Sequence, residues 1–272
     1  VFDAALARIR WLFSEFEHVY VDISGGKDST VVLNLSLKVA EEMGRLPLKV
    51  MFIDQEAEWQ TVIEHMRVIM SDPRVEPYWY QMPIKIFNAT STLEPWLYCW
   101  EEGKDWIREK EPNSIKVNRY GTDRFAEVFG ATLRTYHPHE SACNIAGVRA
   151  EESPARARGL TTYETYKGVT WGKVRSKALK HFDFYPVYDW SYTDVWKAIQ
   201  ANGWPYCPIY DYMYQHGVSV QQMRVSNVHH ETAVTTLFYL QEIEGETWNK
   251  ITERIGGINT AGQLKGQFFC PD

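Results

Sequence analysis

The sequence predicts a doubly wound α/β fold with a mostly parallel sheet, followed by a helical C-terminal segment. Short apolar strands alternate with amphipathic helices over residues 18–84, and a glycine-rich turn joins the first strand to its helix. After residue 204 the patterning is helical. A strand, helix, strand alternation requires parallel strands with right-handed crossovers, so we expect helices on both faces of one sheet.

The first half of the chain carries the clearest alternation of strands and helices. Its strands are continuous runs of β-branched and aromatic residues, and its helices have apolar residues at intervals of three and four. Gly44 and Pro47 end one helix, as such residues often do. The expected series is helix 4–16, strand 18–23, helix 29–43, strand 48–53, helix 57–70 and strand 78–84.

Residues 88–121 interrupt this rhythm with tryptophans, acidic residues and prolines, which indicates an insertion. We therefore expect a nucleotide-binding α/β domain at 1–203, with the Trp-rich insertion at 88–121, and a helical C-terminal segment at 204–272. The later elements that we expect are helix 122–136, strand 142–148, strand 184–187, helix 191–202 and helices near 231–239 and 248–254.

The composition excludes several classes of protein. No run approaches the roughly 18 apolar residues of a membrane span, and no signal peptide is evident, so we expect a cytoplasmic protein without a membrane partner. The net charge of −6 does not imply DNA binding, so any contact with DNA would depend on a local basic surface.

Four cysteines lie far apart without a C-x-x-C pair, so we expect neither an iron–sulfur cluster nor zinc. Two groups of potential metal ligands, His137 with His139 and Cys143, and His229 with His230, lack a complete ligand set. We interpret both as packing residues. The cysteines are Cys99, Cys143, Cys207 and Cys270.

The glycine-rich turn at residues 24–30 predicts a pyrophosphate-binding loop. Gly25 and Gly26 allow positive φ and a close approach to an anion, and the N–H groups at a helix start point at it. The loop differs from the longer G-x-x-x-x-G-K-[ST] loop, and an ordinary turn with a helix cap is the alternative. The residues expected to bind are Ser24, Gly25, Gly26, Lys27, Asp28, Ser29 and Thr30.

Three residues outside the loop are further candidates. Asp54 ends a strand, where a carboxylate can reach a ribose hydroxyl or Mg²⁺; a solvated carboxylate at a helix start is the alternative. Arg149 and Arg156 suit the charge on a leaving pyrophosphate; structural salt bridges are the alternative. Residues 149–180 hold eight basic and three acidic residues, which suits an anionic ligand or a solvated surface. The predicted catalytic residues are Lys27, Asp28, Arg149 and Arg156.

Four motifs in order resemble the PAPS reductase-like branch of the PP-loop ATP-pyrophosphatase superfamily: SGGKDST at 24–30, FID at 52–54, R-x-x-E-S at 149–153 and Y-P-x-Y-D-W at 185–190. The insertion and the stretch 208–225 resemble the IbrA/YbdN-like subgroup of prophage gene-expression co-activators. The resemblance implies a Rossmann-like fold of the adenine nucleotide alpha-hydrolase type, ATP and Mg²⁺ as ligands, and a ParB-like partner.

Departures from this family disfavour sulfonucleotide (PAPS) reduction. Cys270 lacks the family's Glu-Cys-Gly-x-His-like setting, and residues 217–225 hold Ser, Gln and Met where related proteins place cluster cysteines. We therefore expect cleavage of ATP between its α and β phosphates, with adenylylation of an acceptor that the sequence does not identify. The alternative is a nucleotide-sensing regulatory subunit that acts with a ParB-like partner or DNA, which the Trp-rich insertion favours.

Overall fold

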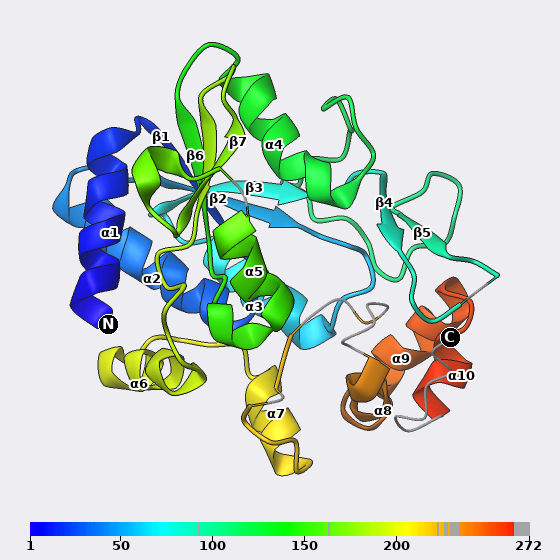
Figure 1. Cartoon of the computed structure of the whole chain (residues 1–272). Coiled ribbons are helices and arrows are strands. Elements are labelled where there is room, and N and C mark those ends of the chain that lie inside the picture. Colours follow the sequence, from blue (N-terminus) through cyan, green and yellow to red (C-terminus); the bar gives the residue numbers. More distant parts are fainter. Residues whose placement is uncertain (92, 163, 222, 226–227, 229–233, 264–272) are drawn as a thin grey trace. The chain divides into compact units, whose positions relative to one another are not determined.

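The computed structural model describes residues 1–272 except 92, 163, 222, 226–227, 229–233 and 264–272 (Figure 1). The chain divides into two compact units, each assembled from three segments. The first unit comprises Val1–Phe52, Arg67–Tyr78 and Ala126–Tyr206. The second comprises Ile53–Met66, Trp79–Phe125 and Cys207–Asp272.

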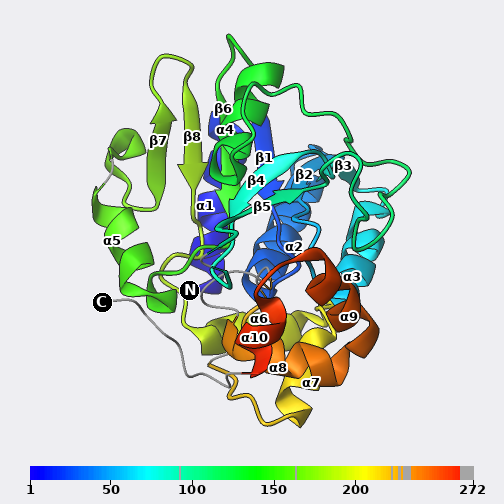
Figure 2. The ribbon, with the colours of Figure 1, turned by 90° about the vertical axis from the view of Figure 1, so that its right-hand side faces the viewer.

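A six-stranded sheet with the order β3-β2-β1-β6-β8-β7 is the framework of the first unit. β1 pairs in parallel with β2 and with β6, and β6 pairs in parallel with β8. β7 is antiparallel to β8, and the two form the hairpin at one edge in Figure 2. The mostly parallel sheet confirms the predicted fold class. The strands are β1 (His18–Asp22), β2 (Leu48–Ile53), β3 (Val75–Tyr80), β6 (Ala142–Ala146), β7 (Gly172–Ser176) and β8 (His181–Phe184).

Helices cover both faces of this sheet, as the parallel connections require. Trp11 of α1 packs edge-on against Phe184 of β8, with 6.0 Å between ring centroids. Tyr20 of β1 lies on the other face, and its hydroxyl is 2.9 Å from Nε2 of His137, which follows α4. The helices of this unit are α1 (Phe2–Glu15), α2 (Lys27–Glu42), α4 (Phe125–Tyr136), η1 (Ala150–Glu152), α5 (Pro154–Thr162), η2 (Tyr166–Gly168) and α6 (Tyr192–Asn202). The helix α3 (Gln60–Met70) runs across the division, and only its last residues, from Arg67, belong to the first unit.

Strand boundaries were predicted less well than the alternation itself. The strand expected at 78–84 is wrong: β3 ends at Tyr80, and β4 (Ile84–Phe87) begins a separate antiparallel pair with β5 (Trp96–Cys99). Pro83 lacks an N–H to continue the ladder. The strand expected at 184–187 lies at 181–184, and β7 was not predicted because its residues are largely polar.

Among the residues that the structure describes, the second unit contains the β4–β5 hairpin, residues 60–66 of α3, and four further helices. α8 packs against α9 and α10, and buried Leu240 and Trp248 contribute to its core. The predicted helix 231–239 corresponds to α8, although residues 231–233 lie outside the described part of the chain. In the described part, no helix is long and apolar enough to cross a bilayer. The helices are α7 (Ile209–Gln215), α8 (Val234–Ile243), α9 (Gly245–Arg254) and α10 (Ile258–Gln263).

Candidate functional site

Two loops of the first unit lie at the switch point of the sheet, where successive strands are added on opposite sides of β1. From β1 the chain crosses to β2 and β3 on one side, whereas β6 and β8 lie on the other side. The 24–30 loop follows β1, and Gly147 to Arg149 follow β6. Ligands of open α/β sheets bind beyond the carboxyl ends of the strands at such a point. These two loops are therefore the candidate site.

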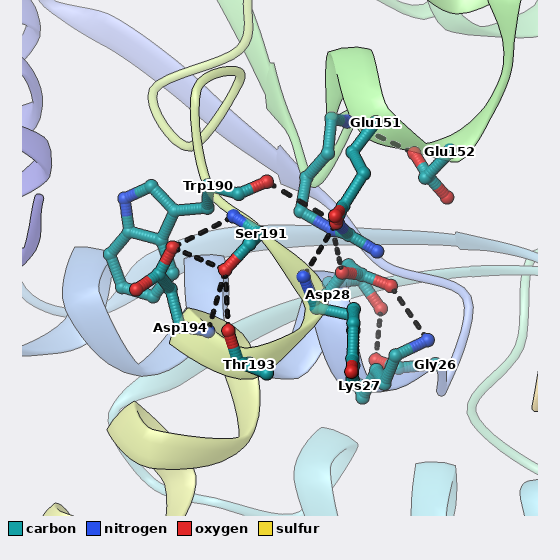
Figure 3. Close-up of polar contacts among 12 residues, drawn as sticks. Gly26, Lys27, Asp28, Glu151, Glu152, Trp190, Ser191, Thr193 and Asp194 are labelled. Atoms are coloured by element: carbon teal, nitrogen blue, oxygen red, sulfur yellow. Dashed lines mark hydrogen bonds and ion pairs between the residues drawn. The ribbon is translucent and has the colours of Figure 1, made fainter. Parts of the chain in front are cut away.

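The 24–30 loop is shaped by its own hydroxyl and backbone groups (Figure 3). Gly25 has φ 73°, and Gly26 is the N-cap of α2. The Ser29 hydroxyl donates to the Gly26 carbonyl at 2.9 Å and accepts from the Ser24 N–H at 3.2 Å. The Thr30 hydroxyl donates to the same carbonyl at 3.0 Å. These bonds fix the turn, and the first N–H groups of α2 have no intrahelical acceptor, which suits them to an anion.

Gly147 lets the loop after β6 lie against the start of α2. A Cβ at this position would be 2.7 Å from the carbonyl carbon of Asp28 and 2.8 Å from the amide nitrogen of Ser29. Backbone atoms cannot yield as a flexible side chain can. Sequence analysis did not single out Gly147, because only the fold shows what faces it.

Asp28 contacts one cation of its own loop and one of the loop after β6, and the second contact joins the two loops. One of its carboxylate oxygens accepts from Nε of Arg149 at 2.5 Å, and the other lies 3.3 Å from Nζ of Lys27. Lys27 and Arg149 are each 4% exposed. The structure thus brings together three of the predicted catalytic residues, whose roles stay predictions.

Acceptors from three places hold the Arg149 guanidinium. Nη1 donates to Glu151 at 2.8 Å and to the Trp190 carbonyl at 3.3 Å. Burial disfavours the charged form, but the neighbouring carboxylates of Asp28, Glu152 and Glu151 outweigh it, and the pKa of Arg149 is raised. Nη2 makes no hydrogen bond with the described residues.

Arg156 and the other basic residues of 149–180 are mostly paired with nearby groups. Arg156 lies in α5, its side chain is 46% exposed, and it is 3.4 Å from Glu152. Lys173 is buried, and its ammonium donates to the Leu160 carbonyl. Three further pairs are Lys167 with Glu15, Arg175 with Asp183 and Lys177 with Glu164. These contacts account for much of the positive surplus counted in the sequence.

Asp54 lies in the second unit, where four donors surround its carboxylate. One oxygen accepts from Trp79 Nε1 at 3.0 Å and Gln81 Nε2 at 2.9 Å. The other accepts from the Glu56 N–H at 3.0 Å and from Arg108. A magnesium ion would have to displace Arg108, so the carboxylate as it stands does not fit the metal. Its predicted ribose or magnesium role stays a prediction.

Two more glutamates are buried near Asp54. Glu56 accepts from the Trp100 N–H at 2.6 Å and from Arg254 Nε at 2.9 Å. Glu58 is 4% exposed, and burial, together with the charge of Asp54, raises its pKa to about 8 against the opposing charge of Arg108. The Glu58 carboxyl therefore keeps its proton at neutral pH, beside two carboxylates that are paired with Arg108 and Arg254.

The described cysteines are buried free thiols. Burial raises the pKa of Cys207 to about 12 and that of Cys99 and Cys143 well above the ordinary value. A thiolate is the reactive form, so these three residues are poor nucleophiles. Cys270 and the pair His229 and His230 lie outside the described residues.

Comparison with known proteins shows relatives along nearly the whole chain. The family model for the phosphoadenosine phosphosulfate reductase domain matches residues 18–260 of this chain. The uncharacterized protein YbdN of Escherichia coli K12 is 28% identical over 98% of this chain and 68% of its own length. Sulfate adenylyltransferase subunit 2 of Sulfurimonas denitrificans is 24% identical over 74% of this chain and 63% of its own length.

A solved structure shows the same kind of fold. Candida glabrata FMN adenylyltransferase, in complex with FAD and inorganic pyrophosphate, superposes with a TM-score of 0.53 at 15% identity. The match covers 84% of this chain and 61% of that chain. Our chain thus spans less than two thirds of the length of both adenylyltransferases. At this identity the likeness supports the Rossmann-like α/β fold and no more.

Alanine substitutions at Gly147 and at Gly159 should change the stability of the protein in opposite directions, because only Gly147 lies against backbone atoms. Gly147→Ala places a methyl group against backbone and should lower the free energy of unfolding by about 1–3 kcal/mol. Gly159→Ala lies in α5 with nothing within 4 Å and should raise it by about 0.5–1 kcal/mol. Urea unfolding measures both, and equal changes would contradict the close approach.

The buried Glu58 carboxyl predicts a pH dependence of stability. Its pKa is about 8 in the folded state and near 4.5 when unfolded, so the folded state keeps a proton that the unfolded state releases between these values. The free energy of unfolding should fall as pH rises from 4.5 to 8 and level off outside that window. Glu58→Gln should remove up to about 5 kcal/mol of this dependence. The exposed Glu253→Gln is the control; an unchanged slope in Glu58→Gln would disprove the assignment.

Proposed function

Because the chain belongs to the phosphoadenosine phosphosulfate reductase domain family, we propose that it binds ATP at the 24–30 loop and cleaves it between the α and β phosphates. The observation that carries the proposal is the arrangement after β1 and β6. There the start of α2, the Lys27 ammonium and the Arg149 guanidinium belong to two loops held together by Asp28. A relative, the sulfate adenylyltransferase subunit, is named for the same class of transfer.

In this proposal the β and γ phosphates lie on the N–H groups of the loop and the first turn of α2, where the helix dipole favours negative charge. An oxyanion of the acceptor attacks the α phosphorus, and the bond to the β-phosphate oxygen breaks. The products are an adenylylated acceptor and pyrophosphate. Lys27 and Arg149 stabilise the charge that develops on the leaving group, and the more exposed Arg156 is the third cation.

Magnesium is part of the proposal as the ion that accompanies ATP phosphates in solution. Lewis-acid stabilisation of phosphate charge is the chemistry that it supplies. No step depends on Asp54, whose oxygens already accept from Trp79, Gln81 and Arg108. The predicted role of Asp54 in binding ribose or magnesium therefore stays a prediction.

Replacement of Lys27 tests the proposal directly. Lys27→Ala should lower pyrophosphate release from Mg-ATP by at least about 100-fold, since a point charge on the phosphates is lost. Lys38→Ala is the matched control, because Lys38 lies on the same helix, is 52% exposed and pairs with Glu42. Release should be measured with and without candidate acceptors such as sulfate. If ATP binds and no pyrophosphate appears with any acceptor, cleavage is rejected.

A second candidate function is nucleotide sensing by a regulatory subunit with a ParB-like partner. It is favoured by the aromatic face of the β4–β5 hairpin, which we define as Lys85, Phe87, Trp96 and Tyr98. Phe87, Trp96 and Tyr98 are 52%, 47% and 48% exposed, and the Lys85 ammonium lies 4.4 Å from the Trp96 ring centroid. Exposed aromatic residues of this kind are typical of protein interfaces. Of the other two tryptophans in the insertion, Trp100 is fully buried and Trp106 is partly buried.

This second function predicts that the aromatic face binds the partner. The double variant Phe87→Ser with Trp96→Ser should weaken binding of a ParB-like protein by at least about tenfold, because aromatic anchors contribute most to interfaces. Val117→Ser, at a residue that is 71% exposed in the same unit, is the control. Titration calorimetry with and without ATP measures the effect. Equal affinities for the variant and the control would exclude this surface.

A further inference from the structure

His18, His137 and Glu140 form a cluster at the other end of the sheet from the candidate site. His18 begins β1, and Glu140 lies in the turn before β6. Nε2 of His18 and Nδ1 of His137 lie 3.2 Å and 3.1 Å from the same carboxylate oxygen of Glu140. All three potential ligand atoms lie within 4.8 Å of one another. The geometry points to a binding site for a divalent transition-metal ion such as Zn²⁺.

The distances fit a single small ion. Zinc at about 2.1 Å from nitrogen and oxygen ligands, in tetrahedral geometry, keeps those ligands about 3.4 Å apart. The two imidazole–carboxylate distances are already close to this value. The two imidazole rings stack with 3.8 Å between centroids and an interplanar angle of 17°. Stacked rings hold their lone pairs in separate planes, so at least one imidazole turns out of the stack when both bind one ion.

The surroundings of the cluster also favour a metal. Nε2 of His18 is buried and faces the Glu140 carboxylate at 3.2 Å. Nε2 of His137 faces the Tyr20 hydroxyl at 2.9 Å, and the His137 carbonyl lies 2.9 Å from Nε2 of His181. The Tyr20 contact holds the His137 imidazole in one orientation.

The chemistry of the ligands selects the class of ion. Two imidazoles and a carboxylate suit zinc and its neighbours, whereas Mg²⁺ prefers oxygen ligands alone. The Glu140 side chain is 58% exposed, so solvent can reach the ion and supply a fourth ligand. A metal here joins the turn before β6 to the start of β1, which makes it a stabilising tie. This site is independent of the proposed ATP chemistry.

The ligands of this proposed site are not neighbours in sequence. His139 and Cys143 are close to His137 along the chain. In the fold, His139 is exposed, whereas Cys143 shares the sheet face of Phe182, opposite to Tyr20. The missing ligand is His18, which parallel pairing of β1 with β6 brings to the turn.

Zinc binding by the full chain without a polyhistidine tag tests this inference. The wild-type chain should bind one Zn²⁺ with a Kd of about 10 μM or tighter, and Zn²⁺ but not Mg²⁺ should raise its Tm by a few degrees. Co²⁺ should give the visible absorption of a tetrahedral site. Glu140→Gln and His18→Gln should each weaken zinc binding by at least about tenfold. His139→Gln is the matched control and should leave it unchanged.

Two results would overturn the site. One is a wild-type Kd for Zn²⁺ weaker than about 1 mM. The other is an equal loss of affinity in His139→Gln and in the two cluster variants. Because Glu140 is exposed, Glu140→Gln should fold even if His18→Gln does not, and it keeps the test decisive.

Discussion

The parallel pairing of β1 with β6 is the constraint on which the candidate site depends. All five residues of β1 pair in register, from His18 with Ala142 to Asp22 with Ala146. The loops that follow the two strands therefore leave the sheet at the same level. The absence of a side chain at Gly147 allows the second loop to touch the start of α2. Arg149 can then reach Asp28, which lies far away in sequence.

The charges around these loops balance rather than forming a basic surface. The three cations Lys27, Arg149 and Arg156 face the three carboxylates of Asp28, Glu151 and Glu152. In the proposed function, affinity for phosphate therefore comes mainly from backbone N–H groups and the dipole of α2. The ion pair of Asp28 with Arg149 positions the two loops more than it stabilises the fold, because removing both charges from water offsets much of their attraction.

Features encoded by neighbouring residues were predictable. The 24–30 loop is contiguous, and its glycines, hydroxyls and following helix interact over at most five positions in sequence. The central strands were recognised as apolar runs, because strands buried on both faces contain little else. The polar edge strand β7 and the break between β3 and β4 lack such a signal. They arise from pairing with β8 and β5.

The sequence by itself determined the α/β class, the order of the central strands and helices along the chain, and the residues of the glycine-rich loop. Each of these rests on local hydrogen bonding or on hydrophobic periodicity, which a short stretch of chain specifies. Only the tertiary structure decided that Asp28 pairs with Arg149, that four donors surround Asp54, and that His18 lies beside His137. Those contacts join segments that are distant in sequence, and strand pairing and side-chain packing set them together.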